Sequence, residues 1–142
     1  MSAFPVPPER RYRRSHQPLT ALTYQLEHIF EKEKLRNFTL GDSNGLIIAS
    51  AGNPVESEVL AAYAPMLAKS VARRFRQQVL SRVESMMPGI TPESVHVRQI
   101  TVDGQSLYLA LAGRPGIYRD VGLYRAITGV RRILAQQNQS AA

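Results

Sequence analysis

Phe38-Thr-Leu-Gly-Asp-Ser-Asn-Gly-Leu-Ile-Ile-Ala-Ser-Ala-Gly52 is the most informative stretch of this chain. Two apolar runs, 38–40 and 46–51, flank the four residues Asp42-Ser-Asn-Gly45. Asp and Asn side chains bond to their own backbone and Gly tolerates a positive φ, so these four residues predict a tight turn. We therefore expect the two runs to pair as an antiparallel hairpin.

A second hairpin is predicted further along the chain. Residues 95–102 and 106–112 are separated by Asp103-Gly104, a strong turn signal between two runs with strand-forming composition. Residues 46–51 and 107–112 are apolar on both faces, which predicts central strands with helices on either side. Residues 95–102 mix polar and apolar side chains, which predicts an edge strand.

Amphipathic patterns predict helices before, between and after the hairpins. The first covers about 18–36 and the last runs from about 120 to 136. The middle pattern covers 54–86. Asn53 can serve as its N-cap and Pro54 suits N1, while Glu56 stands where a capping box needs an acceptor.

The order α-β-β-α-β-β-α predicts an α+β fold, a three-layer α/β/α sandwich around a central antiparallel sheet of four strands. A fifth strand is expected if residues 114–119 form one rather than a loop. The sandwich would be a single domain over residues 18–136. Residues 1–17 are expected to form a flexible Pro/Arg-rich basic tail, and residues 137–142 a disordered end.

The middle helix raises the question of oligomeric state. If it is continuous, its 33 residues extend about 50 Å, whereas a domain of this length is only about 35–40 Å across. The helix is therefore expected either to break near Gln77-Gln78 or to overhang the domain and expose apolar residues around 79–87. A second copy of the chain is the simplest cover, and the edge strand 95–102 offers it a pairing site.

The composition excludes several chemistries. The chain has 142 residues and no cysteine, so it has no disulfide, thiolate metal site or cysteine nucleophile. The three histidines have no metal-ligand spacing, and no phosphate-binding or dinucleotide-binding glycine motif occurs. We expect no catalytic residue, no cofactor and no metal, and hence no enzyme.

The net charge of +7 points to anionic partners. One concentration is the tail, which could contact nucleic acid or an anionic membrane. The other consists of Lys69, Arg73, Arg74 and Arg76, whose spacing would put Lys69, Arg73 and Arg76 on one side of a helix as a docking stripe for an acidic partner. A solvated tail and a solvated helix face are the plain alternatives.

Residues 38–52 resemble the opening hairpin of the roadblock / dynein light chain family, within the roadblock–longin–profilin-like group and of bacterial type. The Ala-rich start of the middle helix, 60–68, is similar to that family too, and the resemblance covers about residues 19–136. It implies a cytoplasmic, homodimeric scaffold or adaptor that regulates a Ras-like small GTPase.

The resemblance also implies that the chain dimerises through the second helix and the third strand. The residues expected in that interface are Leu67, Val71, Phe75, Val79, Val83, Val97 and Gln99. Two alternatives stay open: a PAS/GAF-like or profilin-like small-molecule sensor with a cavity between sheet and helix, and binding of an anionic surface through the tail.

Overall fold

The computed structural model describes residues 6–70, 72–113 and 127–134, with side chains from residue 19 onward. Four strands form one antiparallel sheet: β1 (Asn37–Asp42), β2 (Ile47–Gly52), β3 (Val95–Val102) and β4 (Gln105–Ala112). Their spatial order is β2-β1-β4-β3. The helices are α1 (Val6–Lys32), α2 (Pro54–Lys69) and α3 (Arg73–Met86), with a 3-10 turn η1 (Pro92–Ser94); residues 127–134 are also helical.

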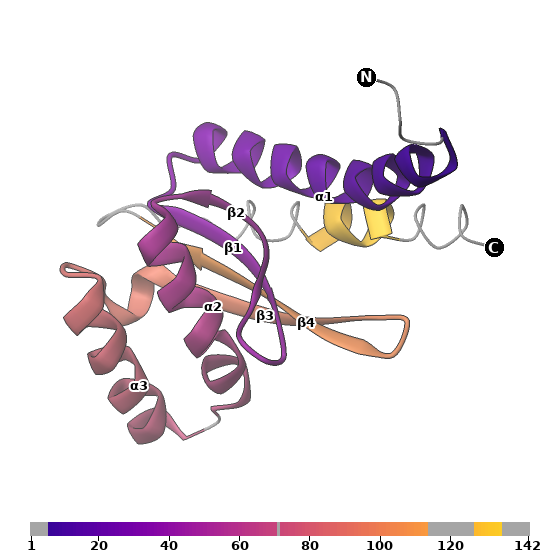
Figure 1. Ribbon diagram of the computed structural model, residues 1–142. Coiled ribbons are helices and arrows are strands. Elements are labelled where there is room, and N and C mark those ends of the chain that lie inside the picture. The colour runs from indigo at the N-terminus through magenta and orange to yellow at the C-terminus, as the bar shows by residue number, and fades with distance from the viewer. Residues whose placement is uncertain (1–5, 71, 114–126, 135–142) are drawn as a thin grey trace.

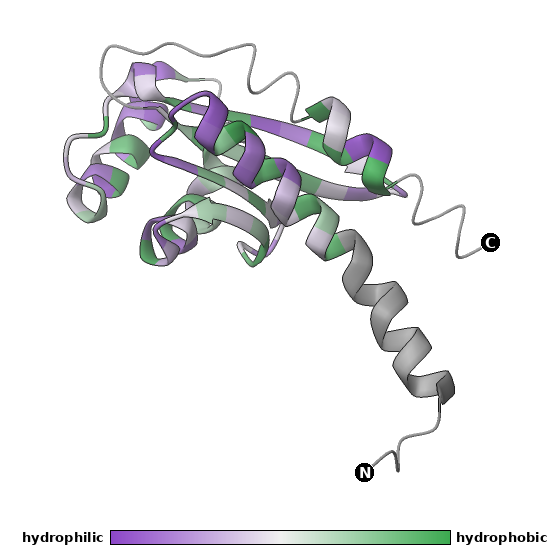
Figure 2. Ribbon diagram, turned by 90° about the horizontal axis from the view of Figure 1, so that it is seen from above, coloured by the Kyte–Doolittle hydropathy of each residue, from purple (hydrophilic) through white to green (hydrophobic). Residues whose placement is uncertain are grey.

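Helices cover both faces of the sheet (Figure 1). On one face, α1 and residues 127–134 pack on Phe38, Leu40 and the leucines of β4. On the other face, α2 and α3 pack on Val95, Val97 and Tyr108. Figure 2 shows hydrophilic and hydrophobic residues side by side along α1, as an amphipathic helix requires. The expected α+β three-layer sandwich is confirmed.

Both hairpins form at the expected turns. Asp103 and Gly104 have φ values of 52° and 75°, the two positive values that a two-residue type I′ hairpin requires. Asp42 Oδ1 accepts hydrogen bonds from the backbone N–H groups of Asn44 (2.9 Å) and Leu46 (3.0 Å), which fixes the first turn. The edge position of β3 and the central position of β4 are as predicted.

The prediction that β2 is a central strand was wrong. β2 lies at one edge of the sheet, and the two central strands are β1 and β4. Ala49 and Ala51 are buried, but Ile47 is partly exposed and Leu46, just before the strand, is 63% exposed. The central strand β1 instead carries buried polar residues, Asn37 and Thr39, which bond to each other and to α2. Apolar content therefore does not identify the central strand here.

The N-cap of α2 is confirmed, since Asn53 Oδ1 accepts from the N–H groups of Val55 and Glu56. Glu56 does not complete a capping box. Its two carboxylate oxygens instead accept from Arg36, each at 3.1 Å, and Arg36 also donates to the carbonyl of Pro88 at 2.8 Å. Arg36 therefore ties the chain before β1 to the start of α2 and to the loop after α3.

The long middle helix is broken, but at 70–72 rather than near Gln77-Gln78. The hydroxyl of Ser70 donates to the carbonyl of Leu67 at 2.9 Å, which satisfies one of the free carbonyls at the end of α2. After the break, α3 turns back so that Val79, Leu80 and Val83 are buried in the core of their own chain. The expected overhang, and the argument for a second copy that rested on it, are wrong.

The first helix begins earlier than expected, at Val6 rather than near residue 18. It therefore includes most of the segment that was expected to be a flexible tail. Prolines at residues 7 and 8 fall in its first turn, where proline is tolerated, and Glu and Arg that follow are good helix formers. Pro18 lies inside this helix and supplies no backbone N–H, so the local sequence does not explain the extension to Val6.

The expected fifth strand at 114–119, the start of the last helix and the end 137–142 lie outside the described residues. Val130 is fully buried against the α1 side of the sheet, so the described part of the last helix does contribute to the core. Within the described ranges, no helix combines the length and the apolar character that crossing a membrane would need.

Candidate functional site

The residues expected at the dimer interface fall into two groups. Four of them have almost no exposed surface, because they belong to the core of this chain between the sheet, α2 and α3: Leu67, Val79, Val83 and Val97. Phe75 is 46% exposed and Gln99 is also exposed, so these two are available to a partner. Val71 lies outside the described residues.

The residues expected in the basic docking stripe are also divided. Lys69, Arg73 and Arg74 are exposed, and no carboxylate in the described part pairs with them. Arg76 is half-buried, and its guanidinium donates to the carbonyls of Leu67 and Val95, both at 3.3 Å. Arg76 therefore anchors α3 to α2 and β3 instead of facing a partner.

The charges in the first turn of α3 do not match the helix dipole. It contains no acidic residue, and its N-cap Ala72 makes no side-chain capping bond. Arg73 and Arg74 thus stand at the positive end of a helix dipole, a position that favours negative charge. The positive potential of this corner is available to an acidic partner.

One flank of α3 is partly apolar and exposed. Phe75, Arg82 and Met86 are spaced by seven and four residues, which places them along one line of the helix. Phe75 is 46% and Met86 44% exposed. This line, called the α3 flank below, combines apolar contact area with a cation.

The free edge of β3 is partly covered by arginine side chains. Arg76 donates to the carbonyl of Val95 at 3.3 Å, and Arg98 donates to the carbonyl of Val97 at 3.4 Å. Backbone groups of alternate residues in an edge strand face away from the sheet, so the next outward-facing groups are those of Gln99 and Thr101. Strand pairing with a second copy is therefore open along the second half of β3 and hindered along the first.

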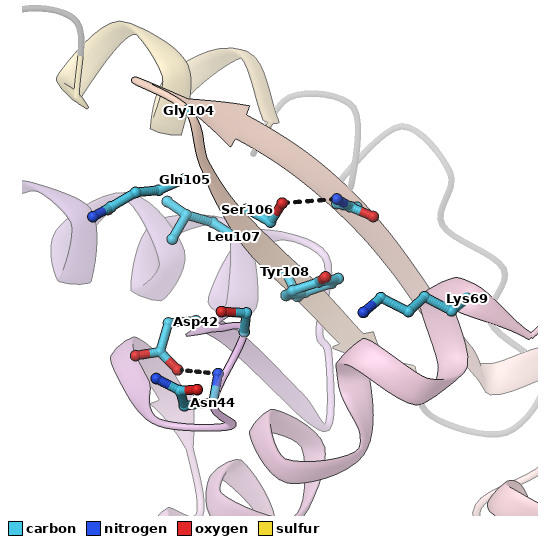
Figure 3. A pocket seen from close by; sticks show the side chains of 10 residues that line it. Asp42, Asn44, Lys69, Gly104, Gln105, Ser106, Leu107 and Tyr108 are labelled. Carbon is cyan, nitrogen blue, oxygen red and sulfur yellow. Dashed lines mark hydrogen bonds between the residues drawn. The ribbon is translucent and has the colours of Figure 1, made fainter.

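A groove of about 500 Å³ lies where the sheet extends past the end of α2. It is called the tip groove below, and Figure 3 shows its lining. The lining comes from the first turn, the end of α2 and the β3–β4 hairpin: Asp42, Ser43, Asn44, Lys69, Gln99, Gly104, Gln105, Ser106, Leu107 and Tyr108.

The tip groove is lined by several hydrogen-bond donors and by one carboxylate, that of Asp42. Asp42 already accepts two backbone N–H groups of its own turn. Gln99 donates its amide to the Ser106 hydroxyl at 2.9 Å, which leaves the hydroxyl proton of Ser106 free for another acceptor. Lys69 extends from the last turn of α2 toward Tyr108 (Figure 3).

Tyr108 is the unusual residue of the groove. Its side chain is only 1% exposed, and its hydroxyl has no hydrogen-bond partner among the described residues. Tyr108 nevertheless lines the tip groove. Its cross-strand neighbour in β1 is Gly41, which contributes no side chain on that face.

Sequence reasoning missed the tip groove. Its signal was present, because Tyr108 is a hydroxylated aromatic inside the otherwise aliphatic run 107–112. Among the described residues, no three His, Cys, Asp or Glu side chains gather as metal ligands would.

Comparison with protein-family models finds no match, and comparison with curated proteins finds none either. Among solved structures, MglB of Myxococcus xanthus is similar, with 13% sequence identity and a TM-score of 0.49 over 84% of this chain and 91% of that chain. A likeness of this extent establishes neither a shared family nor a shared function.

Proposed function

We propose that this protein is a non-enzymatic, homodimeric interaction module that docks an acidic protein partner. The observation that carries the proposal is the surface of α3. There, Arg73 and Arg74 are exposed at the start of the helix, and no described carboxylate neutralises them, while the α3 flank carries exposed apolar side chains. We assign the unpaired charge to docking and steering of the acidic partner and the apolar flank to the second copy of the chain.

The homodimer is proposed to form through the α3 flank and the second half of β3. Phe75 and Gln99 are the residues of the expected interface that remain exposed in the single chain. The buried members of the expected set, such as Leu67 and Val83, would support this surface from beneath without touching the second copy. An exposed phenylalanine and an unpaired strand edge are each the kind of surface that association covers.

The partner is proposed to be a Ras-like small GTPase, and the protein would act in the cytoplasm. Both statements derive from the resemblance of residues 38–52 and 60–68 to the roadblock family.

Light scattering after size exclusion tests the dimer. The full chain is expected at twice its mass of 15.8 kDa, and Phe75→Ser is expected to give the single-chain mass. Val55→Ser is the matched control, because Val55 is 65% exposed on the first turn of α2 and outside the proposed contact. Even weak dimers assemble at a concentration of about 100 μM, so a wild-type chain that is monomeric there would refute the dimer.

Capture by immobilised Ras-like GTPase, loaded with GDP or with a non-hydrolysable GTP analogue, tests the partner. Retention that depends on the nucleotide and is weakened by Arg73→Ser with Arg74→Ser is the expected result. Retention that is unaffected by the two substitutions would contradict docking through this corner.

The sensor alternative has one observation in its favour, the tip groove. Its volume of about 500 Å³ is enough for a small molecule. However, the groove lies at the open end of the sheet beside α2 and is lined largely by polar residues, unlike the apolar cavity between sheet and helix that this alternative expects.

A further inference from the structure

We propose that the tip groove is a carboxylate-binding site that receives an acidic side chain of the docked protein partner. The inference rests on the proposed function in one respect, because the carboxylate is taken to belong to that partner. It adds a place on the surface, a ligand class and two residues that bind it, Lys69 and Tyr108.

The first step is that the groove has a cation that forms no ion pair, although one carboxylate, Asp42, also lines it. Lys69 lines the groove and forms no ion pair among the described residues. The carboxylate nearest in the lining, Asp42, is held by the N–H groups of Asn44 and Leu46 in its own turn. An incoming carboxylate would therefore be attracted by the unpaired ammonium group of Lys69 and repelled by Asp42, whose charge those two N–H groups do not cancel, so it is expected to bind on the Lys69 side of the groove.

The second step is the Tyr108 hydroxyl. The ring is fixed because it is packed in the core under α2, and Tyr108 lines the groove with no hydrogen-bond partner for its hydroxyl among the described residues. A hydroxyl held in place by a buried ring loses little conformational entropy when it donates to a ligand. The free proton of the Ser106 hydroxyl, which Gln99 has already positioned, provides another donor to the same space.

The third step is continuity with the docking surface. Lys69 ends α2, and Arg73 begins α3 after a break of three residues. Lys69, which lines the groove, and Arg73 are therefore only four residues apart in the chain. An extended acidic segment with a carboxylate at every second residue presents them on one face about 6.6 Å apart, so that it could offer one to Lys69 and others to the arginines.

The test is an amide NMR titration of the full chain with the peptide acetyl-(Glu-Gly)₄-amide, and with acetyl-(Gln-Gly)₄-amide as the uncharged control. The expected result is saturable binding of the Glu peptide, with shifts at the amides of Lys69, Ser106 and Tyr108. Lys69→Met is expected to weaken binding about tenfold, the loss typical of one charge-assisted hydrogen bond. Tyr108→Phe is expected to weaken it about tenfold as well, because a hydroxyl that donates to a carboxylate also makes a charge-assisted hydrogen bond.

Lys32→Met is the matched control for charge, because Lys32 is an exposed lysine in the last turn of α1. It should change the affinity less than twofold. Equal effects of Lys69→Met and Lys32→Met would overturn the proposal, as would equal binding of the Gln peptide. Shifts confined to Arg73 and Arg74 would also overturn it, because the carboxylates would then stay outside the groove.

Vesicles of phosphatidylserine provide a further arm. If they perturb the groove amides and the Glu peptide does not, the site serves a lipid surface and the proposal is wrong. The two proposals fail separately: a monomeric chain that does not bind a GTPase leaves a positive peptide titration intact, and a negative titration leaves dimerisation and capture by a GTPase intact. The dispersion of the amide spectrum shows directly that each variant is folded.

Discussion

Substituting Asn37 by alanine tests how the sheet is joined to α2. Asn37 is fully buried in β1, and its amide donates to the Ser57 hydroxyl at 3.0 Å and to the Asn53 carbonyl at 3.2 Å. Its side-chain oxygen accepts from the hydroxyls of Thr39 at 2.6 Å and Ser57 at 3.3 Å. This network connects a central strand to the first turn of the helix that ends at the tip groove.

The magnitude follows from which groups lose a partner. Ser57 keeps its bond to the Asn53 carbonyl at 3.1 Å, but the buried hydroxyl of Thr39 would have no partner left. An orphaned buried polar group costs about 1–3 kcal/mol, and each lost bond about 1 kcal/mol. We expect Asn37→Ala to lower the free energy of unfolding by about 2–4 kcal/mol.

The second substitution, Thr39→Val, makes the reasoning refutable. In the wild type it removes one satisfied hydrogen bond and should cost about 1 kcal/mol. In the Asn37→Ala background it removes the orphaned hydroxyl and should be neutral or stabilising. Urea unfolding followed by circular dichroism measures all four variants of this cycle. If Thr39→Val costs the same in both backgrounds, the network does not act as described.

Four further substitutions probe other features. Arg36→Met should destabilise the fold by about 1 kcal/mol, since its ion pair with Glu56 is partly exposed, and the loss measured by urea unfolding should shrink in high salt. Gly52→Ala should be severely destabilising in thermal unfolding, because its φ is +115° and a Cβ would lie 2.8 Å from Asn37 Nδ2. Gly104→Ala meets no neighbour within 4 Å and has a φ of +75°, so only the backbone penalty of about 1 kcal/mol is expected. Arg76→Met should free the Val95 carbonyl at the β3 edge, and sedimentation should show increased self-association; unchanged sedimentation would contradict a protective role for Arg76.

Local chemistry explains what the sequence predicted correctly. Asn53, Pro54 and the turn residues Asp103 and Gly104 act through bonds and φ values of their own segments, so the hairpins and the start of α2 could be placed without tertiary information. The three-layer arrangement followed from counting apolar faces.

Tertiary contacts explain what was predicted wrongly. The break at 70–72 contains neither glycine nor proline, and it is stabilised by Ser70 within α2 and by Arg76 reaching β3. The central position of β1 depends on polar residues that are satisfied by α2, which no periodicity reveals. The tip groove combines residues 42–44, 69 and 99–108, three regions far apart in the chain.

The strand order β2-β1-β4-β3 has a consequence for how the chain reaches its native state during synthesis. Each hairpin closes locally, but the two halves of the sheet are joined only by β1 with β4, between positions such as Phe38 and Leu111. Pairing over so long a loop is slow compared with hairpin closure. The leucines of β4 beneath α1 can therefore be buried only after residue 112 has left the ribosome. Until then the apolar surface of the nascent chain stays exposed, which is the kind of surface that chaperones bind.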